Sequence, residues 1–325
     1  MKQRKNSKII RRSLLTVVVV FCLLMLTPRI LSILFPGWMP VGYGFILADK
    51  LALITGLEKM VNLTPPVPSD VEEIKEIEYR KINGKSLAID LYRPRDTTLV
   101  PPLLVFIHGG SWTSGKRSDY LVYLVHFASR GYVTATISYR FLQDSLYPAC
   151  IEDVNAALDW LYENAGKYRY DQSRIAVIGG SAGGHLAMLA AYGWTGKDSD
   201  STRAKVKAVV DFYGPADLTT TYARNHVLVR NLIGRKYEDA TDLYHDASPL
   251  FHTTVNSPPT LIFHGTSDEL VPLSQSKALK TRLDSLGVYS EFYSMPLWPH
   301  TMDIARRVND FAKNKMEVFL GKYLK

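Results

Sequence analysis

Short apolar runs that end in glycine recur along the chain and alternate with helical patterns. The clearest are LLVFIHGG, IAVIGG, AVVDFYG and TLIFHG. Runs of this kind, without polar alternation, are typical of strands buried on both faces of a parallel sheet. An earlier pair of runs, EIKEIEYRKI and KSLAIDLYRP, alternates polar and apolar residues around Asn83-Gly84 and predicts an antiparallel hairpin. We therefore expect an α/β fold: a mostly parallel sheet, an antiparallel N-terminal hairpin and helices on both faces.

One interval interrupts this alternation. Residues 215–257 contain many polar and aromatic residues but no clear buried strand. In an open α/β sheet, an excursion at the carboxyl end of a strand lies above the ligand crevice. Two interpretations stay open for this interval, a lid or substrate wall and a surface loop with two helices.

The N-terminus is basic and then apolar. The apolar run Ser13–Leu26 has fourteen residues, and apolar character resumes in ILSILF after Pro28-Arg29. Fourteen helical residues span about 21 Å, short of the ~30 Å hydrocarbon core, whereas a helix that reaches Phe35 is long enough to cross it. Residues 1–35 therefore favour an uncleaved transmembrane signal-anchor, with a cleaved signal peptide or a peripheral helix as alternatives. The basic end is expected in the cytoplasm and the remainder outside, at the cell membrane or secreted.

The net charge of +8 does not indicate a nucleic-acid partner, because it is concentrated in the basic end. The chain beyond residue 12 is nearly neutral, and a lipid bilayer is the expected partner of the N-terminal segment. The Pro-rich residues 36–70 predict a stiff linker to a catalytic domain over 71–325. The basic residues at the start are Lys2, Arg4, Lys5, Lys8, Arg11 and Arg12.

A serine lies among glycines directly after the run IAVIGG, in the segment 179–183 (GGSAG). A phosphate-binding loop would require a lysine here, and a dinucleotide fingerprint would require glycine where Ser181 stands. The pattern Gly-x-Ser-x-Gly between a strand and a helix instead matches a nucleophile elbow, whose sharp turn exposes the serine hydroxyl. We therefore expect Ser181 to be a nucleophile.

A nucleophilic serine needs a histidine base and a carboxylate that orients the base. After an elbow, the expected chain order is serine, acid, histidine. Asp268 follows the run TLIFHG, and His300 follows the last expected strand. Glu269 and Asp211 are alternatives for the acid. The remaining histidines lie in helices, at strand ends or ahead of Asp268 and fit structural roles better.

Backbone donors for an oxyanion are expected in the segment 108–112 (HGGSW), which directly follows the first buried strand. The predicted donors are the N–H groups of Gly110, Ser111 and Ala182. Trp112 and Trp298 are candidates for lining an acyl or aromatic pocket, with packing in the core as the alternative.

Neither cysteine indicates redox chemistry. Cys22 lies in the apolar N-terminal run, and Cys150 lies in a helical pattern where a small core residue is expected, so no internal disulfide is predicted. No paired histidines or Cys-x-x-Cys occur at ligand spacing, so the residues do not support metal or redox chemistry, and no metal is expected.

These motifs resemble the α/β-hydrolase superfamily, in particular the esterase/lipase branch with an HGG(G/S)W oxyanion loop, which includes hormone-sensitive-lipase-like and feruloyl- and acetyl-xylan-esterase-like enzymes. The resemblance covers roughly residues 75–323 and includes SYRF, YPACIEDVNAALDWL, RIAVIGGSAGGHLA and PPTLIFHGTSDELVP in the family's order. It implies a serine-dependent ester hydrolase without a cofactor, with Ser181 as nucleophile, Asp268 as acid and His300 as base. The chain departs from the family at 297–299 (LWP), where glycines usually precede the histidine, and at Ser111, where the family usually has a third glycine.

The resulting expectation is a carboxylesterase or lipase that acts on a small-molecule ester outside the membrane. A serine peptidase of the prolyl-oligopeptidase type is an alternative, although the roughly 70 residues ahead of the domain are too few for the β-propeller of those enzymes. A non-catalytic interaction protein on the same fold is a further alternative. No particular acyl length or oligomeric state is predicted.

Overall fold

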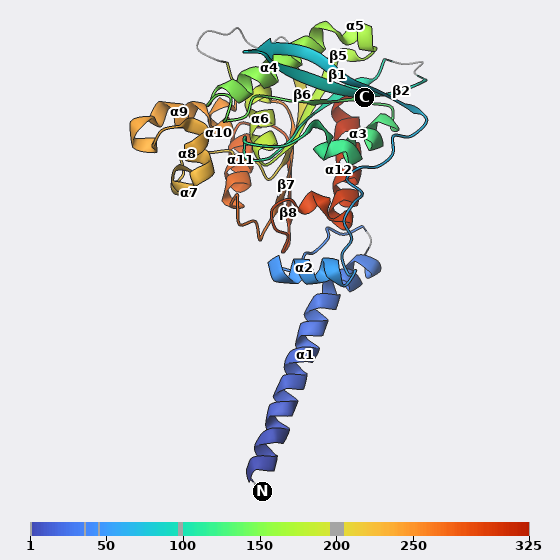
Figure 1. Ribbon diagram of the computed structural model, residues 1–325, viewed down its shortest axis with the longest axis vertical. Helices are drawn as coiled ribbons and strands as arrows, with labels where there is room; N and C mark the ends of the chain where they lie inside the picture. Colours follow the sequence, from blue (N-terminus) through green and yellow to red (C-terminus); the bar gives the residue numbers. More distant parts are fainter. Residues whose placement is uncertain (1, 36, 45, 97–99, 196–204, 325) are drawn as a thin grey trace.

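The computed structural model describes residues 2–35, 37–44, 46–96, 100–195 and 205–324, with side chains from residue 11 onward other than that of Ile46. An eight-stranded sheet in the order β1-β2-β4-β3-β5-β6-β7-β8 forms its centre (Figure 1). β2 pairs antiparallel with β1 and with β4, and all later neighbours in this order are parallel. The predicted α/β class with an antiparallel N-terminal hairpin is thus confirmed. The strands are β1 (Val71–Ile82), β2 (Lys85–Pro94), β3 (Pro102–Ile107), β4 (Val133–Ile137), β5 (Asp171–Gly180), β6 (Val206–Phe212), β7 (Thr260–Gly265) and β8 (Ser290–Met295).

The hairpin turns at Asn83 and Gly84, between Ile82 and its partner Lys85. Both turn residues have positive φ, 51° and 80°. This is the requirement of a two-residue type I′ turn, which Asn-Gly meets at low steric cost. The hairpin is therefore encoded locally, in the two residues that join its strands.

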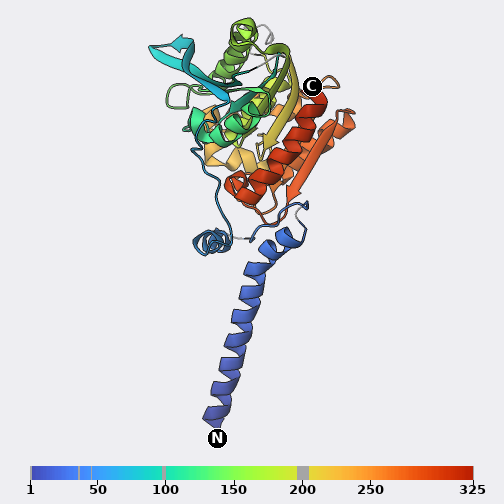
Figure 2. The same ribbon diagram turned by 90° about the vertical axis from the view of Figure 1, so that its right-hand side faces the viewer.

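Helices cover both faces of the sheet (Figure 2). Side chains of β3 alternate between two buried cores, with Val105 and Ile107 in one and Leu104 and Phe106 in the other. The first core is completed by α4, α6 and α11, and the second by α3 and α12. The continuous apolar runs of the sequence are explained by this burial on both faces. These helices are α3 (Leu121–Ala128), α4 (Ala149–Glu163), α6 (Ala182–Ala191), α11 (Ser274–Ser285) and α12 (Arg306–Leu324); the short α5 (Ala165–Tyr168) precedes β5, η1 (Arg117–Tyr120) precedes α3 and η3 (Met302–Ile304) precedes α12.

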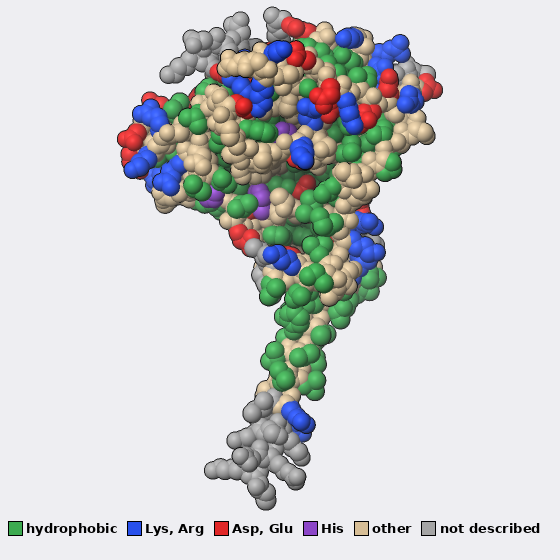
Figure 3. Space-filling model, viewed as in Figure 1, with side chains coloured by type: hydrophobic (Ala, Val, Ile, Leu, Met, Phe, Trp, Pro, Cys, Tyr) green, Lys and Arg blue, Asp and Glu red, His purple; other side chains and the backbone are tan. Residues whose placement is uncertain are grey.

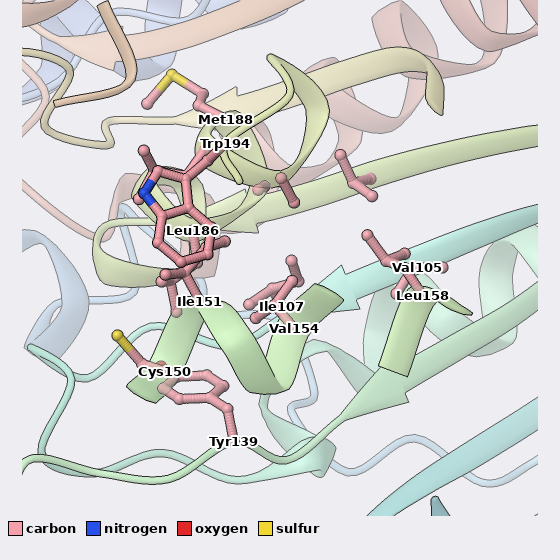
Figure 4. Close-up of a cluster of buried hydrophobic side chains, with 14 of the residues drawn as sticks. Val105, Ile107, Tyr139, Cys150, Ile151, Val154, Leu158, Leu186, Met188 and Trp194 are labelled. Atoms are coloured by element: carbon pink, nitrogen blue, oxygen red, sulfur yellow. The ribbon is translucent and has the colours of Figure 1, made fainter. Parts of the chain in front are cut away.

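Cys150 lies in the first of these cores, at the start of α4 (Figure 4). Its side chain lies on the same helix stripe as Val154 and Leu158, and the residue is 1% exposed. Burial raises the pKa of the thiol to about 12, which keeps it protonated. Cys150 therefore has the core role expected from the sequence.

The interval between β6 and β7 consists of short helices. Its beginning is fixed to α11, because the N–H groups of Ala216 and Asp217 both donate to Gln275 Oε1, at 2.9 and 2.7 Å. The hydroxyl of Tyr222 donates to the carbonyl of Leu270, in the loop after β7. One side of this interval thus borders the loop that carries Asp268. Its helices are α7 (Thr221–Asn225), α8 (Val227–Ile233), η2 (Tyr237–Asp239), α9 (Thr241–Asp246) and α10 (Pro249–His252).

The N-terminal helix α1 (Lys2–Leu34) projects away from the domain (Figure 1). Its segment Arg11–Leu34 has 24 residues; the most apolar 18-residue window within it has a mean hydropathy of 2.5, and only 11% of that window is buried. Among the described residues, it is the one helix long and apolar enough to cross a membrane; a signal sequence has the same properties.

The expected linker contains a helix, α2 (Ile46–Ile54), and is hydrogen-bonded to the domain. The N–H groups of Gly42 and Gly44 donate to the carbonyls of Pro296 and Leu297, at 2.8 and 3.1 Å. The proline content predicts stiffness but carries no information on these contacts, which lie more than two hundred residues apart in sequence. Residues 37–60 are therefore called the connector below.

Candidate active site

Ser181 occupies the turn between β5 and α6, at the carboxyl edge of a central strand. Its φ of 55° and ψ of −122° form a sharp turn, and its N–H donates to the carbonyl of Phe212 at 2.8 Å. A Cβ on Gly183 would lie 2.0 Å from the carbonyl oxygen of Ile107, and one on Gly179 would lie 2.3 Å from the backbone of Gly183. Glycine is thus required at both positions by backbone contacts.

The structure brings Ser181, His300 and Asp268 together from the loops after three different strands. His300 Nδ1 is 2.6 Å from Asp268 Oδ2, and His300 Nε2 is 3.0 Å from Ser181 Oγ. Because a carboxylate only accepts hydrogen bonds, Nδ1 carries the proton and Nε2 is left to accept from the serine hydroxyl. This arrangement has the geometry of a nucleophile, a general base and an orienting acid.

The carboxylate of Asp268 is fully buried and has four hydrogen-bond donors around it. Oδ1 accepts from the N–H groups of Leu270 and Val271, both at 2.9 Å, and Oδ2 lies 3.3 Å from His264 Nε2 in addition to His300. Burial acts to raise the pKa of Asp268, but the hydrogen bonds from His264 and His300 outweigh it and hold the pKa well below its ordinary value. The acid is therefore ionised at neutral pH.

The two alternative acids lie elsewhere. Glu269 is exposed, and no described contact joins it to His300. Asp211 is completely buried, and its Oδ1 accepts from the N–H of Gly214 at 2.9 Å. Burial raises the pKa of Asp211, which favours its neutral form. Neither carboxylate is placed to orient the histidine.

Two residues beside the site were not predicted from the sequence. His264, at the end of β7, contacts Asp268, and the only sequence signal is its spacing of four residues before the acid. The ring of Tyr213 lies 4.5 Å from that of His300, and its hydroxyl donates to the buried Asp303. Tyr213 has a φ of 46°, which aims its ring from the end of β6. No motif in the sequence marks it.

The segment 108–112 turns sharply beside the nucleophile. Gly110, Ser111 and Trp112 all have positive φ, of 108°, 55° and 58°. A Cβ on Gly109 would lie 3.5 Å from that of Ser181, so the loop passes against the nucleophile. Within the described part of the chain, no acceptor is recorded for the N–H groups of Gly110, Ser111 or Ala182. Free amides at this position are suited to a developing oxyanion.

The two tryptophans singled out in the sequence are both buried. Trp112 is 4% exposed and lies edge-on to His185, with 5.2 Å between ring centroids. Trp298 is 3% exposed, and its Nε1 donates to the carbonyl of Pro40 at 2.9 Å. Trp298 lies in the loop 296–300, which carries His300 and is called the histidine loop below. It thus joins this loop to the connector. The departure from glycine before His300 thus includes a tryptophan with a structural partner in the connector.

His108 and His185 both make structural hydrogen bonds to backbone carbonyls. His108 Nδ1 bonds the carbonyl of Gly109 at 2.9 Å, and burial lowers the pKa of the ring. His185 Nε2 donates to the carbonyl of Ala247 at 2.7 Å, and burial lowers its pKa to about 4. Among the described residues, no group of three or more His, Cys, Asp or Glu side chains is arranged to hold a metal ion.

The chain is similar in sequence to known esterases. The BD-FAE family model matches residues 89–283. "Probable carboxylic ester hydrolase LipM" and "Esterase LipC" of Mycobacterium tuberculosis are each 33% identical, over 68% and 69% of this chain. The chain spans 54% and 59% of their lengths, less than two thirds of either.

Solved structures share the fold. Thermogutta terrifontis esterase 2, phosphoramylated by tabun, is 24% identical and superposes with a TM-score of 0.67 over 79% of this chain and 96% of its own. A bifunctional GH43-CE protein of Bacteroides eggerthii is 28% identical, with a TM-score of 0.68 over 78% of this chain and 38% of its own. The family model covers more than half of the chain, and the chain belongs to the BD-FAE family, with the α/β-hydrolase fold of esterases.

Proposed function

We propose that this protein is a serine-dependent carboxylic ester hydrolase with Ser181 as nucleophile, His300 as base and Asp268 as acid. The observation that carries the proposal is the unbroken hydrogen-bond chain from Asp268 Oδ2 through His300 to Ser181 Oγ. Esterase names among the family relatives support the same reaction class. The buried, ionised Asp268 supports it further, because the acid keeps the imidazole in the tautomer that accepts the serine proton.

The reaction follows from the geometry. Ser181 Oγ attacks the ester carbonyl carbon as its proton passes to His300 Nε2. The negative charge that develops on the carbonyl oxygen is stabilised by the N–H groups of Gly110, Ser111 and Ala182. His300 then gives the proton to the leaving alcohol, and a water molecule cleaves the acyl-enzyme by the same route.

Labelling with a fluorophosphonate probe tests the nucleophile. The wild-type chain is expected to be labelled, and Ser181→Ala is expected to lose labelling completely. Ser285→Ala, which removes an exposed hydroxyl on α11, is the matched control and should label as wild type. Equal labelling of wild type and Ser181→Ala rejects the assignment.

The leaving group separates an esterase from a peptidase. Hydrolysis of short acyl esters without release of amine from dipeptide substrates is expected for the esterase. Turnover of dipeptides alone would instead support a peptidase of the prolyl-oligopeptidase type. Absence of probe labelling together with a specific binding partner would support a non-catalytic protein.

We further propose that α1 anchors the chain in a membrane, with the catalytic domain on the outer side. The apolar segment Arg11–Leu34 and the basic residues before it support this orientation. The full chain should stay in the membrane fraction after alkaline carbonate extraction and keep an N-terminal tag. Release of the chain, or loss of the tag with export, contradicts an uncleaved anchor.

A further inference from the structure

The connector contacts the same edge of the sheet that holds the active site. Its hydrogen bonds go to Pro296 and Leu297, in the loop that leads to His300, and its Lys59 carbonyl accepts from the N–H of Arg306 at 2.7 Å. Figures 1 and 2 both show β7 and β8 next to α2 and the upper end of α1. The catalytic edge of the sheet therefore faces the end of the candidate membrane helix.

The buried guanidinium of Arg307 fixes the catalytic edge of the sheet against the end of α1. Arg307 Nε donates to Glu58 Oε2 at 2.8 Å, and its Nη1 donates to the carbonyls of Pro28 and Val41, at 3.0 and 3.3 Å. The guanidinium also lies 5.3 Å from the ring centre of Trp298. The side chain of Arg307 thus contacts α1, the connector and the histidine loop at once. A flexible linker would not keep these three segments in contact.

The helix α2 lies across the end of α1 that adjoins the domain. It runs horizontally in Figure 1, where α1 rises steeply, and is seen end-on in Figure 2. Its small residues Ala48 and Ala52 are 1% and 0% exposed, whereas Leu47 and Ile54 are 62% and 82% exposed. A helix in water turns large apolar residues inward, and the reverse arrangement is suited to the boundary of a bilayer.

The level of α2 along α1 agrees with such a boundary. About 20 helical residues cross the hydrocarbon core, so a span that begins near Arg12 ends near Leu31. Met25 of α1 belongs to the same small buried cluster as Tyr43 and the alanines of α2. It lies six residues before that end, about 9 Å deeper along the helix, which is within the depth at which an interfacial helix lies. Trp38, stacked on Phe35 at 4.2 Å, follows the end of the span, where tryptophan is enriched at membrane interfaces.

The apolar surface continues to the rim of the active site. Leu270 and Leu297, which lie close to Asp268 and His300 in the chain, are each 46% exposed. Figure 3 shows hydrophobic side chains continuing from α1 onto the adjoining part of the domain, which is hollowed above α2. Charged side chains are more numerous at the end of the domain far from α1 (Figure 3). Such a contiguous apolar surface beside an anchor indicates a lipid contact.

We propose that the catalytic edge rests on the outer surface of the bilayer, with α2 in the interface, and that the substrate is a lipid carboxylic ester which reaches Ser181 from the membrane. The inference rests on the proposed esterase function. The acyl carbon of the lipid forms a bond to Ser181 Oγ as its bond to the alcohol oxygen breaks. The alcohol leaves with the proton from His300, and water releases the fatty acid.

The test uses the full chain in phosphatidylcholine vesicles with two esters. One is p-nitrophenyl acetate in solution, and the other is 4-methylumbelliferyl oleate embedded in the vesicles. L47E/I54E adds two negative charges to the outward face of α2, which already carries the exposed Lys50, without touching the ester. We expect at least a tenfold loss of oleate hydrolysis and less than a twofold change with the acetate. The matched control V255E adds charge at an apolar residue that is 68% exposed, ahead of β7 at the opposite edge of the sheet, and should change neither rate.

The other outcomes of the two-ester test overturn either this inference alone or the proposed function as well. Unchanged oleate hydrolysis by L47E/I54E overturns the proposal, and so does an equal loss with both esters, which indicates a structural role of α2. Hydrolysis of the acetate but not the oleate by wild type overturns this inference alone. Hydrolysis of neither ester overturns the proposed function as well.

A second measurement, fluorescence quenching, locates α2 relative to the lipid without relying on ester hydrolysis. In a Cys22→Ser background, a fluorophore on I54C should be quenched by spin-labelled lipids, whereas one on V255C should not. The buried Cys150 is protected from labelling. Absence of quenching at residue 54 overturns the placement in the interface, whatever the hydrolysis rates.

Discussion

Ser181 adopts a φ of 55° and a ψ of −122°, a conformation that residues with side chains rarely adopt. The cost of such a backbone is of order 1–3 kcal/mol, and the surrounding structure has to impose it. Close backbone contacts at Gly179 and Gly183 and the bond from Ser181 N–H to Phe212 do so. The glycines around the serine therefore hold the hydroxyl in place by letting α6 and β3 approach the turn.

Substitution of Gly183 tests this packing. In Gly183→Ala, the new Cβ would lie 2.0 Å from the carbonyl oxygen of Ile107, which is backbone and cannot rotate away. We expect a loss of about 1–3 kcal/mol or more in the free energy of unfolding, measured by chemical denaturation of the full chain in detergent. Gly321→Ala is the control, because nothing lies within 4 Å of its Cβ and alanine favours the helix. Equal stability of the two variants would contradict a tightly packed elbow.

Asp268→Asn removes the charge that orients His300. The amide cannot fix the same imidazole tautomer, so kcat is expected to fall about 10³–10⁴-fold.

The pKa of Asp268 lies below its ordinary value of about 4, so its ionised form stabilises the fold above that pH, and the contribution is lost as the pH falls further. Denaturation of wild type and Asp268→Asn at pH 7 and pH 3 checks the sign of this pH dependence of stability. The stability difference should be smaller at pH 3, and a larger difference there would contradict the assignment.

The sequence identifies the residues of the proposed triad better than the residues that contact and position them. Ser181 and Asp268 each follow a recognisable apolar strand and His300 follows the last expected strand, so their positions at one edge could be predicted from strand order. His264 and Tyr213 have no such signal, because their roles arise from contacts between different strands of the finished sheet. Residues that act through packing on a neighbouring strand are not marked by any local pattern.

At the scale of elements, the strands and the hairpin could be predicted because each has a local cause. Period-two alternation, Asn-Gly and continuous apolar runs act within a few residues. The short helices between β6 and β7 and the place of α2 have no local cause of this kind. α2 is held through Glu58 and Arg307, which are 249 residues apart in the chain. Pairing at this separation depends on the complete fold.

The contact of α2 with the domain is expected to depend on pH through Asp49. Burial raises the pKa of Asp49 to about 6, and the nearby carboxylates of Glu269 and Glu58 add to the shift. A raised carboxyl pKa means that the docked helix is stabilised below the ordinary value of about 4 and loses this stabilisation as the pH rises through 6. Amide hydrogen exchange of residues 47–54, corrected for intrinsic rates, should therefore show more protection at pH 5 than at pH 7.

Asp49→Asn provides the control for this effect. The amide does not titrate, so protection of α2 should differ little between the two pH values. A pH dependence as large in Asp49→Asn as in wild type would assign the change to another group.

At the scale of the whole molecule, the connector acts as part of the catalytic domain. It supplies Pro40, Gly42 and Gly44 to the histidine loop, and the carboxylate of Glu58 to the buried Arg307. The side chains of Arg307 and Glu58 are only 9% and 4% exposed, so each depends on the other for its charge partner. A boundary at residue 71, drawn from the first strand, therefore leaves out contacts that hold the catalytic loop.

Two truncated chains test this dependence. Residues 37–325 keep the connector, whereas residues 63–325 lose Glu58 and every connector contact with the histidine loop. Breaking a buried ion pair costs about 3–5 kcal/mol, which lowers Tm by roughly 6 °C or more in a domain of this size. We expect the longer chain to melt correspondingly higher, and to hydrolyse p-nitrophenyl acetate with the higher kcat. Calorimetry and initial rates measure both quantities.

Arg307→Met separates the ion pair from the rest of the connector. In residues 37–325 this substitution leaves Glu58 buried without its cation, so Tm should fall towards that of residues 63–325. In residues 63–325 the partner is already missing, and the same substitution should have little further effect. Equal Tm values for the two unsubstituted chains would mean that the connector is only a spacer. A fall in Tm on Arg307→Met in both chains would instead place the stabilising partner of Arg307 within the domain, because residues 63–325 contain no Glu58.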